Sequence, residues 1–324
     1  MKAWRVEQIT EDGTMHLRDL PVPVPGPGEY LIRVEAAGLN FLDTLMLRGR
    51  YQRKPALPFT PGVECAGTVA GAGEGCKLPP GTRVLAGFET GGFAEFALAP
   101  AAALMPLPEE MPAADALAVL GVNYPTSYYA LHDRARLRPG ETVLVHAGAG
   151  GVGSAAIQLA RHAGARVIAT AGGAAKCETC LGLGAAHAID YAAENWVDAV
   201  RKLTDGRGAD VIYDPVGGEV GEQSLRVLAW MGRYLVVGFA GGAIPKLPAN
   251  RLLLQNAAAL GVVWGELLNR DPAAAGAVRA ALAGLYRQGV IPPLIGARFP
   301  LAEAPAALAA LAGRGSVGKL VLEA

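Results

Sequence analysis

Gly148, Gly150, Gly151 and Gly153 have the spacing of a turn that binds a pyrophosphate. In such a turn the first glycine allows the tight bend. The second removes a Cβ that would hold the phosphate away from the backbone, and the third lets helix and strand pack closely. Gly148, Gly150 and Gly153 fit these roles. The alternative is a glycine-rich turn without a ligand, in a chain that contains 43 glycines.

The residues around these glycines predict the strand and the helix that a phosphate-binding turn requires. The apolar run from Val143 to Val145 predicts the strand. Apolar residues at helical spacing from Val152 to Ala163 predict the helix, and Gly164 follows where it would end. The start of that helix would offer free N–H groups and the positive end of its dipole. This context favours dinucleotide binding over a turn that binds nothing.

The end of the next predicted strand, Arg166 to Thr170, distinguishes between NAD and NADP. A site for NAD places Asp or Glu about twenty residues beyond the glycines, where the carboxylate binds the ribose 2′-OH. This chain has Gly172 and Gly173 there, followed by Lys176 and no acidic residue. A cation without an acid favours NADP(H). The alternative is that Lys176 is an ordinary solvated lysine.

Length and composition indicate a two-domain protein without a nucleic-acid or membrane surface. The chain has 324 residues, a formal net charge of zero and 52% hydrophobic residues. No apolar run approaches the length of a membrane span, and the segment after Met1 lacks the apolar core of a signal peptide. We therefore expect a cytoplasmic protein.

The cysteines and histidines predict neither a disulfide framework nor a metal site. Four cysteines are too few for such a framework in a chain of this length. Cys177 and Cys180 form a C-x-x-C, but no second ligand pair accompanies them. The five histidines are scattered and form no metal-binding pair. We expect no bound metal.

The order of the predicted elements indicates two kinds of domain. Short strands with glycine and proline turns dominate residues 1–100 and predict a small barrel-like domain. Strands and helices then alternate from residue 143 to 238, as in a doubly wound parallel sheet. An apolar strand at 257–265 would lie at the sheet's edge, where pairing with a second copy would give a homodimer. The strand at 318–322 suggests that the tail returns to the first domain.

Six segments along the chain carry a resemblance to a known family. They are 38–43 (GLNFLD), 61–67 (PGVECAG), 147–153 (AGAGGVG), 210–218 (DVIYDPVGG), 232–239 (GRYLVVGF) and 318–322 (GKLVL). The chain resembles the quinone oxidoreductase (zeta-crystallin-like) branch of the medium-chain dehydrogenase/reductase superfamily, over essentially its whole length. The resemblance implies an α/β protein with a GroES-like catalytic domain at 1–122, completed by 266–324. It also implies a Rossmann domain at 123–265 that binds NADP(H), with the site in the cleft between the two.

The same resemblance shows which zinc ligands are missing. Asn40 stands where zinc-dependent relatives have a cysteine, and Val63 stands where they have a histidine. The structural-zinc loop with its four cysteines has no counterpart between Leu85 and Phe93. Without thiolate and imidazole a tetrahedral zinc site is not expected.

The resemblance also implies a role for individual residues. Asn40 and Tyr51 would lie beside the nicotinamide and the substrate as the catalytic pair. The residues expected to bind the cofactor are Thr126, Gly148, Gly150, Gly151, Val152, Gly153, Gly172, Lys176, Tyr191, Gly238 and Phe239. Among these, Lys176 and Tyr191 would meet the 2′-phosphate. Relatives often carry Ser or Thr where this chain has Gly172 and Gly173, and a hydroxyl lost there leaves more of the binding to Lys176.

Several of these residues have a structural alternative. Asn40 and Asp43 could cap the short helix predicted after residue 40. Tyr51 could be a surface aromatic in a basic loop. Gly238 and Phe239 could be a strand end followed by a core aromatic.

The leading functional hypothesis is NADPH-dependent reduction of a quinone or another conjugated carbonyl without a metal. Asn40 or Tyr51 would donate a hydrogen bond to the substrate oxygen as charge develops. One alternative is reduction of the carbon–carbon double bond of enals, enones or enoyl thioesters, because a fold does not fix the substrate. Another is an NADPH-binding or AU-rich-RNA-binding protein with little catalysis. The neutral net charge argues against RNA.

Overall fold

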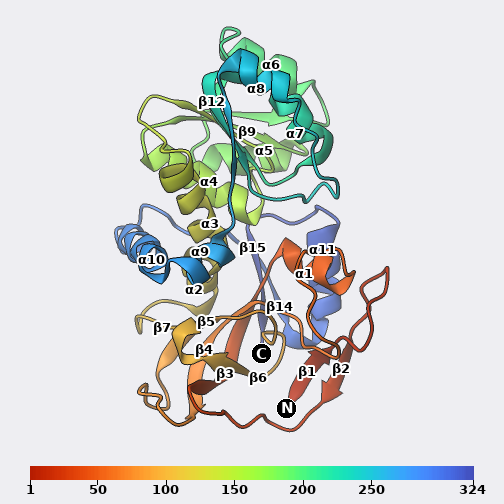
Figure 1. The fold of residues 1–324 in the computed structure, drawn as a ribbon, viewed down its shortest axis with the longest axis vertical. Coiled ribbons are helices and arrows are strands. Elements are labelled where there is room, and N and C mark those ends of the chain that lie inside the picture. Colours follow the sequence, from red (N-terminus) through yellow and green to blue (C-terminus); the bar gives the residue numbers. More distant parts are fainter. The chain divides into compact units, whose positions relative to one another are not determined.

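The structure is a computed structural model that describes every residue from Met1 to Ala324. The chain divides into two compact units (Figure 1). Met1–Val122 and Pro293–Ala324 form the first unit, and Asn123–Pro292 form the second. One boundary of this division falls between Val122 and Asn123. At the other end the second unit extends to Pro292 instead of residue 265, because helix α10 (Pro272–Arg287) packs against α3 (Asn123–Tyr128).

The first unit is built on a seven-stranded sheet in which the tail of the chain pairs with an early strand. The strand order is β14-β15-β3-β4-β5-β7, with β6 pairing to β3. These strands are β3 (Glu29–Leu39), β4 (Glu64–Ala72), β5 (Arg83–Gly87), β6 (Phe96–Pro100), β7 (Leu104–Pro106), β14 (Ile295–Pro300) and β15 (Lys319–Glu323). β15 runs antiparallel to β3, with Leu320 opposite Leu39. The expected return of the tail to the first unit is therefore confirmed, although β14 had no clear signal in the sequence.

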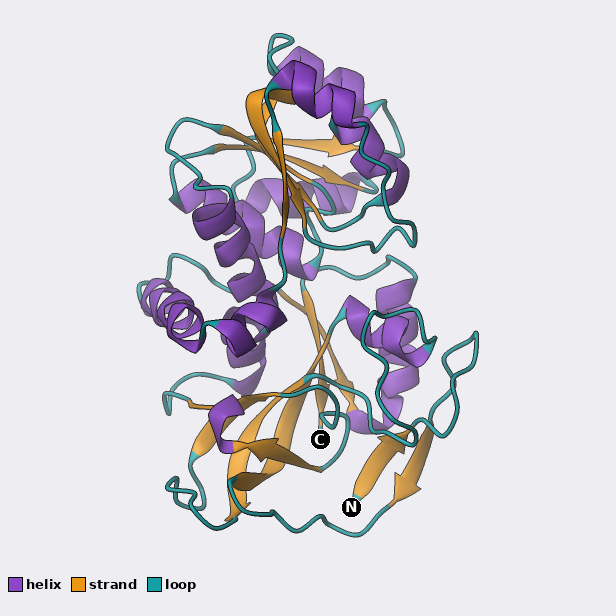
Figure 2. Cartoon of the chain, in the orientation of Figure 1, coloured by secondary structure: helices purple, strands orange, loops and turns teal.

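Two helices flank this sheet on one side. α1 (Phe41–Leu47) begins directly after β3 and packs against α11 (Ala304–Ala312), as Figure 2 shows. α11 in turn contacts β15 and β3. A separate two-stranded sheet, β1 (Lys2–Arg5) with β2 (His16–Asp19), completes the unit together with α2 (Ala113–Ala116) and the π-helical turn η2 (Leu117–Gly121).

The second unit is a six-stranded parallel sheet with helices on both faces (Figure 2). Its order, β10-β9-β8-β11-β12-β13, is that of a dinucleotide-binding fold. The strands are β8 (Thr142–Val145), β9 (Arg166–Ala171), β10 (His187–Asp190), β11 (Ala209–Asp214), β12 (Leu228–Val236) and β13 (Ala258–Gly261). β8 is buried at every position, as expected for a central strand covered on both faces.

The helices of this unit alternate with its strands, as the sequence predicts. They are α4 (Gly151–His162), α5 (Ala174–Gly182), α6 (Trp196–Leu203), α7 (Gly218–Ser224), α8 (Ala249–Gln255) and α9 (Trp264–Arg270), besides α3 and α10. β13 pairs only with β12 and lies at the edge of the sheet. It ends at Gly261, earlier than expected, because Trp264 already belongs to α9.

Candidate active site

The glycine turn connects β8 to α4 at the carboxyl end of the central strand. The N–H of Gly148 donates to the carbonyl of Thr170 at 2.9 Å, and the N–H of Gly150 donates to the carbonyl of Ala147 at 2.9 Å. Gly150 is the N-cap of α4. The turn therefore presents the amino end of a twelve-residue helix directly after a buried strand.

Gly148, Gly150 and Gly153 differ in which atoms an added Cβ would contact. A Cβ on Gly148 would lie 2.9 Å from both the Cβ of Ala169 and the Sγ of Cys180. A Cβ on Gly153 would overlap the carbonyl oxygen of Ala147. At Gly150 the only atom within 4 Å is that same oxygen, at 3.2 Å. Gly148 and Gly153 thus allow the chain to pack closely, whereas Gly150 faces open space where a ligand could approach.

A serine of helix α3 forms a hydrogen bond to the start of α4. The Ser127 hydroxyl donates to the carbonyl of Val152 at 2.9 Å and lies 2.9 Å from the hydroxyl of Tyr213. This contact holds the end of α3 against the first turn of α4. Thr126, the neighbour of Ser127, is buried in α3. Gly151, Val152 and Thr126 therefore belong to one local structure around the glycine turn.

Tyr191 lies against Gly172 at the end of β9. A Cβ on Gly172 would be 2.7 Å from the Tyr191 hydroxyl oxygen. The phenol thus occupies the space that a serine or threonine side chain would need. Lys176, half-buried in the first turn of α5, follows four residues later. The glycine at position 172 and the tyrosine at position 191 are therefore complementary.

The sheet also brings a carboxylate to this turn, which the sequence did not indicate. Asp190 lies opposite Ala171 in the register of β10 with β9. Its Oδ1 accepts the N–H groups of Gly173 and Ala192, each at 2.9 Å. These two backbone bonds lower the pKa of Asp190. An acid is thus present at the turn, but it comes from the neighbouring strand.

Gly238 and Phe239 lie in the loop after β12, against the loop after β11. The N–H of Gly238 donates to the carbonyl of Asp214 at 3.3 Å. The Phe239 ring lies against Gly217, where an added Cβ would be 2.8 Å from its Cδ1. Phe239 is half-buried and does not belong to the core. Asp214 orders the facing loop, because its Oδ1 accepts the N–H groups of Val216 at 2.7 Å and Gly217 at 3.0 Å.

His146, directly before the glycine turn, is a buried hydrogen-bonded histidine. Its Nδ1 lies 2.9 Å from the Thr170 hydroxyl, and its Nε2 lies 2.9 Å from the Ser224 hydroxyl. Burial lowers the pKa of His146 and so favours the neutral ring. It connects the ends of β8, β9 and α7 beneath the glycine turn.

In the first unit Asn40 joins a buried ion pair. Asn40 is the N-cap of α1, and its backbone N–H donates to Asp43 Oδ2 at 2.8 Å. Its Oδ1 accepts from Lys319 Nζ at 2.8 Å, and its Nδ2 donates to Glu64 Oε1 at 2.8 Å. Lys319 Nζ and Glu64 Oε1 are 2.5 Å apart. Asn40 thus occupies the N-cap position proposed from the sequence, but its side chain bonds to the charged pair, and the Asp43 side chain makes the capping bond.

Neither Glu64 nor Lys319 was recognised as a site residue from the sequence. The available signal was a charged residue inside each of the segments 61–67 and 318–322, since a charge that becomes buried in the fold is rare unless it is paired. Tyr51, in the loop after α1, is half-buried and packs against the hydrophobic core of the first unit. It is therefore not a fully solvated aromatic.

The pKa of Asp43 predicts a pH dependence of stability. Burial raises this pKa to about 7, although the Asn40 N–H and the Lys319 charge lower it. In the unfolded chain the pKa of this carboxyl is about 3.9. Between about pH 3.9 and about pH 7, therefore, the carboxyl keeps its proton in the folded protein and loses it in the unfolded chain. The protonated Asp43 carboxyl therefore contributes its full stabilisation below about pH 4, and this stabilisation is lost as the pH rises through about 7.

We expect Asp43→Asn to remove this dependence, because the amide oxygen can still accept the Asn40 N–H. Wild type should lose about 1.4 kcal/mol for each pH unit across this window relative to the variant. Urea unfolding followed by circular dichroism, at pH values from about 5 to 8, measures the difference. Parallel curves for the two proteins would show that Asp43 does not titrate in this window.

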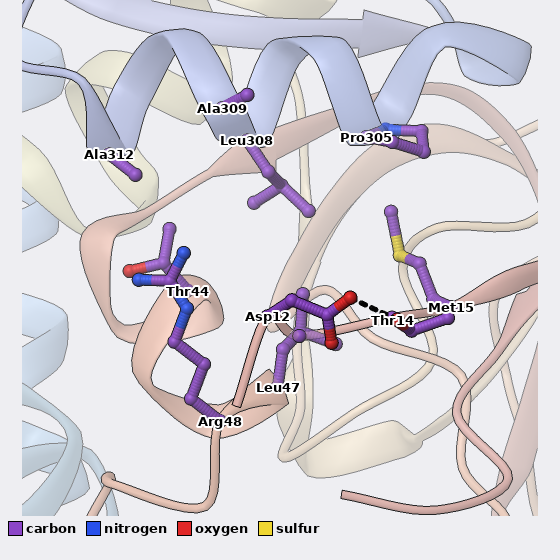
Figure 3. Close-up of a pocket in the computed structure, with 11 residues that line it drawn as sticks. Asp12, Thr14, Met15, Thr44, Leu47, Arg48, Pro305, Leu308, Ala309 and Ala312 are labelled. Atoms are coloured by element: carbon purple, nitrogen blue, oxygen red, sulfur yellow. Dashed lines mark hydrogen bonds between the residues drawn. The ribbon is translucent and has the colours of Figure 1, made fainter. Parts of the chain in front are cut away.

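A hollow of about 310 Å³ also lies in the first unit (Figure 3). Its lining combines the loop around Asp12 with one face of α1 and one face of α11. Thr44 and Leu47 face Leu308 across it. No residue predicted for the active site lines this hollow.

Comparison with known proteins agrees with this architecture. Residues 26–109 match the family described as alcohol dehydrogenase GroES-like domain, and residues 151–280 match the family described as zinc-binding dehydrogenase. Quinone oxidoreductase-like protein 2 of Rattus norvegicus is 41% identical over 304 residues, covering 93% of this chain and 86% of the relative. Quinone oxidoreductase of the same species is 34% identical over 328 residues, covering 99% and 97%.

A solved structure shows the same likeness. The quinone oxidoreductase of Thermus thermophilus, solved alone and in complex with NADPH, superposes with a TM-score of 0.83 at 38% identity, covering 100% of both chains. A GroES-like unit together with a dinucleotide-binding parallel-sheet unit is the architecture of a medium-chain dehydrogenase/reductase. The chain belongs to the quinone oxidoreductase branch of that superfamily.

The residues present do not fit the zinc ion that one matched family description names. At the positions that resemble the ligands stand the carboxamide of Asn40 and the aliphatic side chain of Val63. The neighbouring carboxylate, Glu64, is paired with the Lys319 ammonium. No group of three or more His, Cys, Asp or Glu side chains is placed to hold a metal ion. A tetrahedral zinc site needs such a set of thiolate, imidazole or carboxylate ligands.

No helix of the structure combines the length and the apolar character needed to cross a membrane.

Proposed function

We propose that the protein is an NADPH-dependent quinone oxidoreductase that works without zinc. The observation that carries this proposal is the set of groups around Asn40, where an amide bonded to an ammonium and a carboxylate stands in place of the thiolate, and Val63 in place of the imidazole. An amide N–H can donate to a carbonyl oxygen but cannot hold a zinc alkoxide. The relatives called quinone oxidoreductase, one of them solved with NADPH, support the same activity.

NADPH, when bound, supplies the hydride, and the protein binds it and orients the substrate. The glycine turn and the amino end of α4 would hold the pyrophosphate, and Lys176 with Tyr191 would hold the 2′-phosphate. Thr126, Gly238 and Phe239 would lie along the nicotinamide half. On the first unit, the Nδ2–H of Asn40 or the hydroxyl of Tyr51 would donate to the quinone oxygen as negative charge develops.

Loss of the NADPH absorbance with a panel of acceptors tests this function. The panel should contain benzoquinones, an ortho-quinone, a 2-alkenal and an enoyl thioester, each repeated with NADH. We expect quinone turnover with NADPH preferred. Turnover of the alkenal or thioester alone would make the protein a double-bond reductase. Tight NADPH binding without any turnover would reject the proposal as well and favour a binding role.

The complementarity of Gly172 and Tyr191 gives a prediction for cofactor affinity. Gly172→Ala would displace the Tyr191 phenol, because the new Cβ would lie 2.7 Å from its oxygen. We expect KM for NADPH to rise about three- to tenfold, less than the full value of a hydrogen bond to a charged group, because the phenol is displaced and not removed. The phenol is half exposed and can rotate, so thermal stability should change little.

The coupling between the two positions provides the control. Adding Gly172→Ala to Tyr191→Ala should raise KM for NADPH no further, because the displaced group is already absent. Equal and additive effects of the two substitutions would show that they act on NADPH separately.

We further propose that the protein is a cytoplasmic homodimer that pairs through β13. This strand lies at the sheet edge with one side unpaired, and Leu253, Leu254 and Val263 nearby are exposed. Unpaired edges and exposed apolar side chains are commonly covered by a second copy. Sedimentation at micromolar concentration tests the dimer, and a monomer-sized profile would contradict it.

A further inference from the structure

Lys319 and Glu64 form an ion pair that is almost completely removed from solvent. Their side chains are 1% and 2% exposed, with Nζ and Oε1 2.5 Å apart. Two glycines of the backbone, Gly38 and Gly121, lie directly against the Glu64 carboxylate. A Cβ on Gly38 would overlap Glu64 Oε1, and a Cβ on Gly121 would overlap Oε2. The chain thus keeps glycine at two positions that touch this one side chain.

Stability alone does not account for such a pair. Removing two charges from water is expensive, and well-packed apolar residues in their place are often neutral or stabilising. The cost is increased here because Glu64 Oε2 has no hydrogen-bond partner. A buried pair with an unsatisfied oxygen therefore points to a role beyond holding the fold together.

The pair fixes the orientation of the Asn40 carboxamide. A lysine ammonium only donates hydrogen bonds and a carboxylate only accepts them. Lys319 must therefore face Oδ1, and Glu64 must face Nδ2, as the 2.8 Å distances show. Rotating the amide by half a turn would set nitrogen against ammonium and oxygen against carboxylate. Asp43 fixes the backbone of the same residue through its N–H.

One N–H of this amide has only a weak partner. Nδ2 donates its other hydrogen to the carbonyl of Gly38 at 3.4 Å, near the limit for a hydrogen bond. We propose that Lys319 and Glu64 are positioning residues that hold Asn40 with this N–H available to donate to the substrate oxygen. They act through Asn40 and do not themselves contact the substrate. The catalytic part of this inference rests on the proposed function.

Two variants separate positioning from structural support. Lys319→Met removes the ammonium but leaves a buried unpaired carboxylate, so it is expected to destabilise the protein. Glu64→Gln with Lys319→Met removes both charges and should regain most of the lost stability. In the double variant no charged group specifies the amide orientation, and only the weak bond to the Gly38 carbonyl remains unchanged. We therefore expect its kcat with a quinone to stay reduced, on the order of a hundredfold, with the Kd for NADPH unchanged.

Two controls accompany these variants. Lys2→Met removes the exposed ion pair with Asp19 and should leave turnover unchanged. In an Asn40→Ala background, Lys319→Met should lower kcat no further, because the amide that it positions is gone. A double variant that regains wild-type kcat, or an equal loss in the Asn40→Ala background, would overturn the proposal.

A spectroscopic readout keeps this test independent of the proposed function. In protein labelled at asparagine, the Nδ2 protons of Asn40 should exchange slowly in wild type and rapidly in the double variant. This result is expected even if no quinone is reduced, in which case only the proposed function fails. Unchanged exchange in the double variant would show that the ion pair does not hold the amide.

Discussion

Gly150→Ala is expected to weaken NADPH binding at least tenfold while the protein stays folded. The backbone at Gly150, with φ −76° and ψ 175°, suits any residue. The added Cβ would meet only the Ala147 carbonyl oxygen, at 3.2 Å, and would otherwise extend into open space. That is the space through which a pyrophosphate would approach the backbone. A tenfold loss corresponds to about 1.4 kcal/mol.

The stability cost of the same change should be small. Alanine is a poorer N-cap than glycine, so a loss of up to about 1 kcal/mol is expected. Fluorescence titration with NADPH and urea unfolding of the same preparation measure the two effects. If affinity and stability fell together, Gly150 would serve packing and not ligand approach.

Gly153→Ala provides the matched contrast within the same turn. Its Cβ would overlap the Ala147 carbonyl oxygen and lie 2.9 Å from Gly148 Cα, so backbone must move. We expect a loss of stability of about 1–3 kcal/mol, together with the loss of binding. Gly284→Ala in α10 meets nothing within 4 Å and serves as a helical control without steric conflict. It should be stabilising by up to about 1 kcal/mol.

Much of the fold could be predicted because its signals are local. The apolar run at 143–145 and the helical pattern after Gly151 predict β8 and α4 nearly to the residue. Alternation of strands and helices then indicates the parallel sheet. The end of the sheet was less clear, because the apolar residues around Trp264 do not show where β13 stops and α9 starts. The exposed helix α8 buries no residue completely and left no apolar stripe to find.

The candidate site could be predicted only where neighbouring residues in the sequence make it. The glycine turn is such a segment. Asp190 reaches the turn through pairing with β9, and Lys319 reaches Asn40 from 279 residues away in the chain. No periodicity in the sequence encodes these contacts. The charges of Lys319 and Glu64 within otherwise apolar segments were the hint, since a buried charge needs a partner.

The charges near the end of β9 should determine how strongly the protein prefers NADPH over NADH. Gly173 N–H, which an anion could otherwise use, already donates to Asp190 at 2.9 Å. We expect Lys176, in the first turn of α5, to supply a positive charge to the 2′-phosphate. Hydrogen bonds to a charged group contribute about 1.5–3 kcal/mol. We expect Lys176→Gln to lower kcat/KM for NADPH about ten- to hundredfold.

NADH has no 2′-phosphate, so its kcat/KM should be unchanged in the Lys176→Gln variant. Asp190→Asn provides the opposite test, because the amide oxygen can still accept the two backbone N–H groups while the negative charge is lost. NADPH should then bind more tightly, and the gain should shrink as salt screens the charges. Initial rates with both cofactors at two salt concentrations measure these effects. An equal loss for NADH and NADPH in Lys176→Gln would place this lysine in the support of α5, away from the 2′-phosphate.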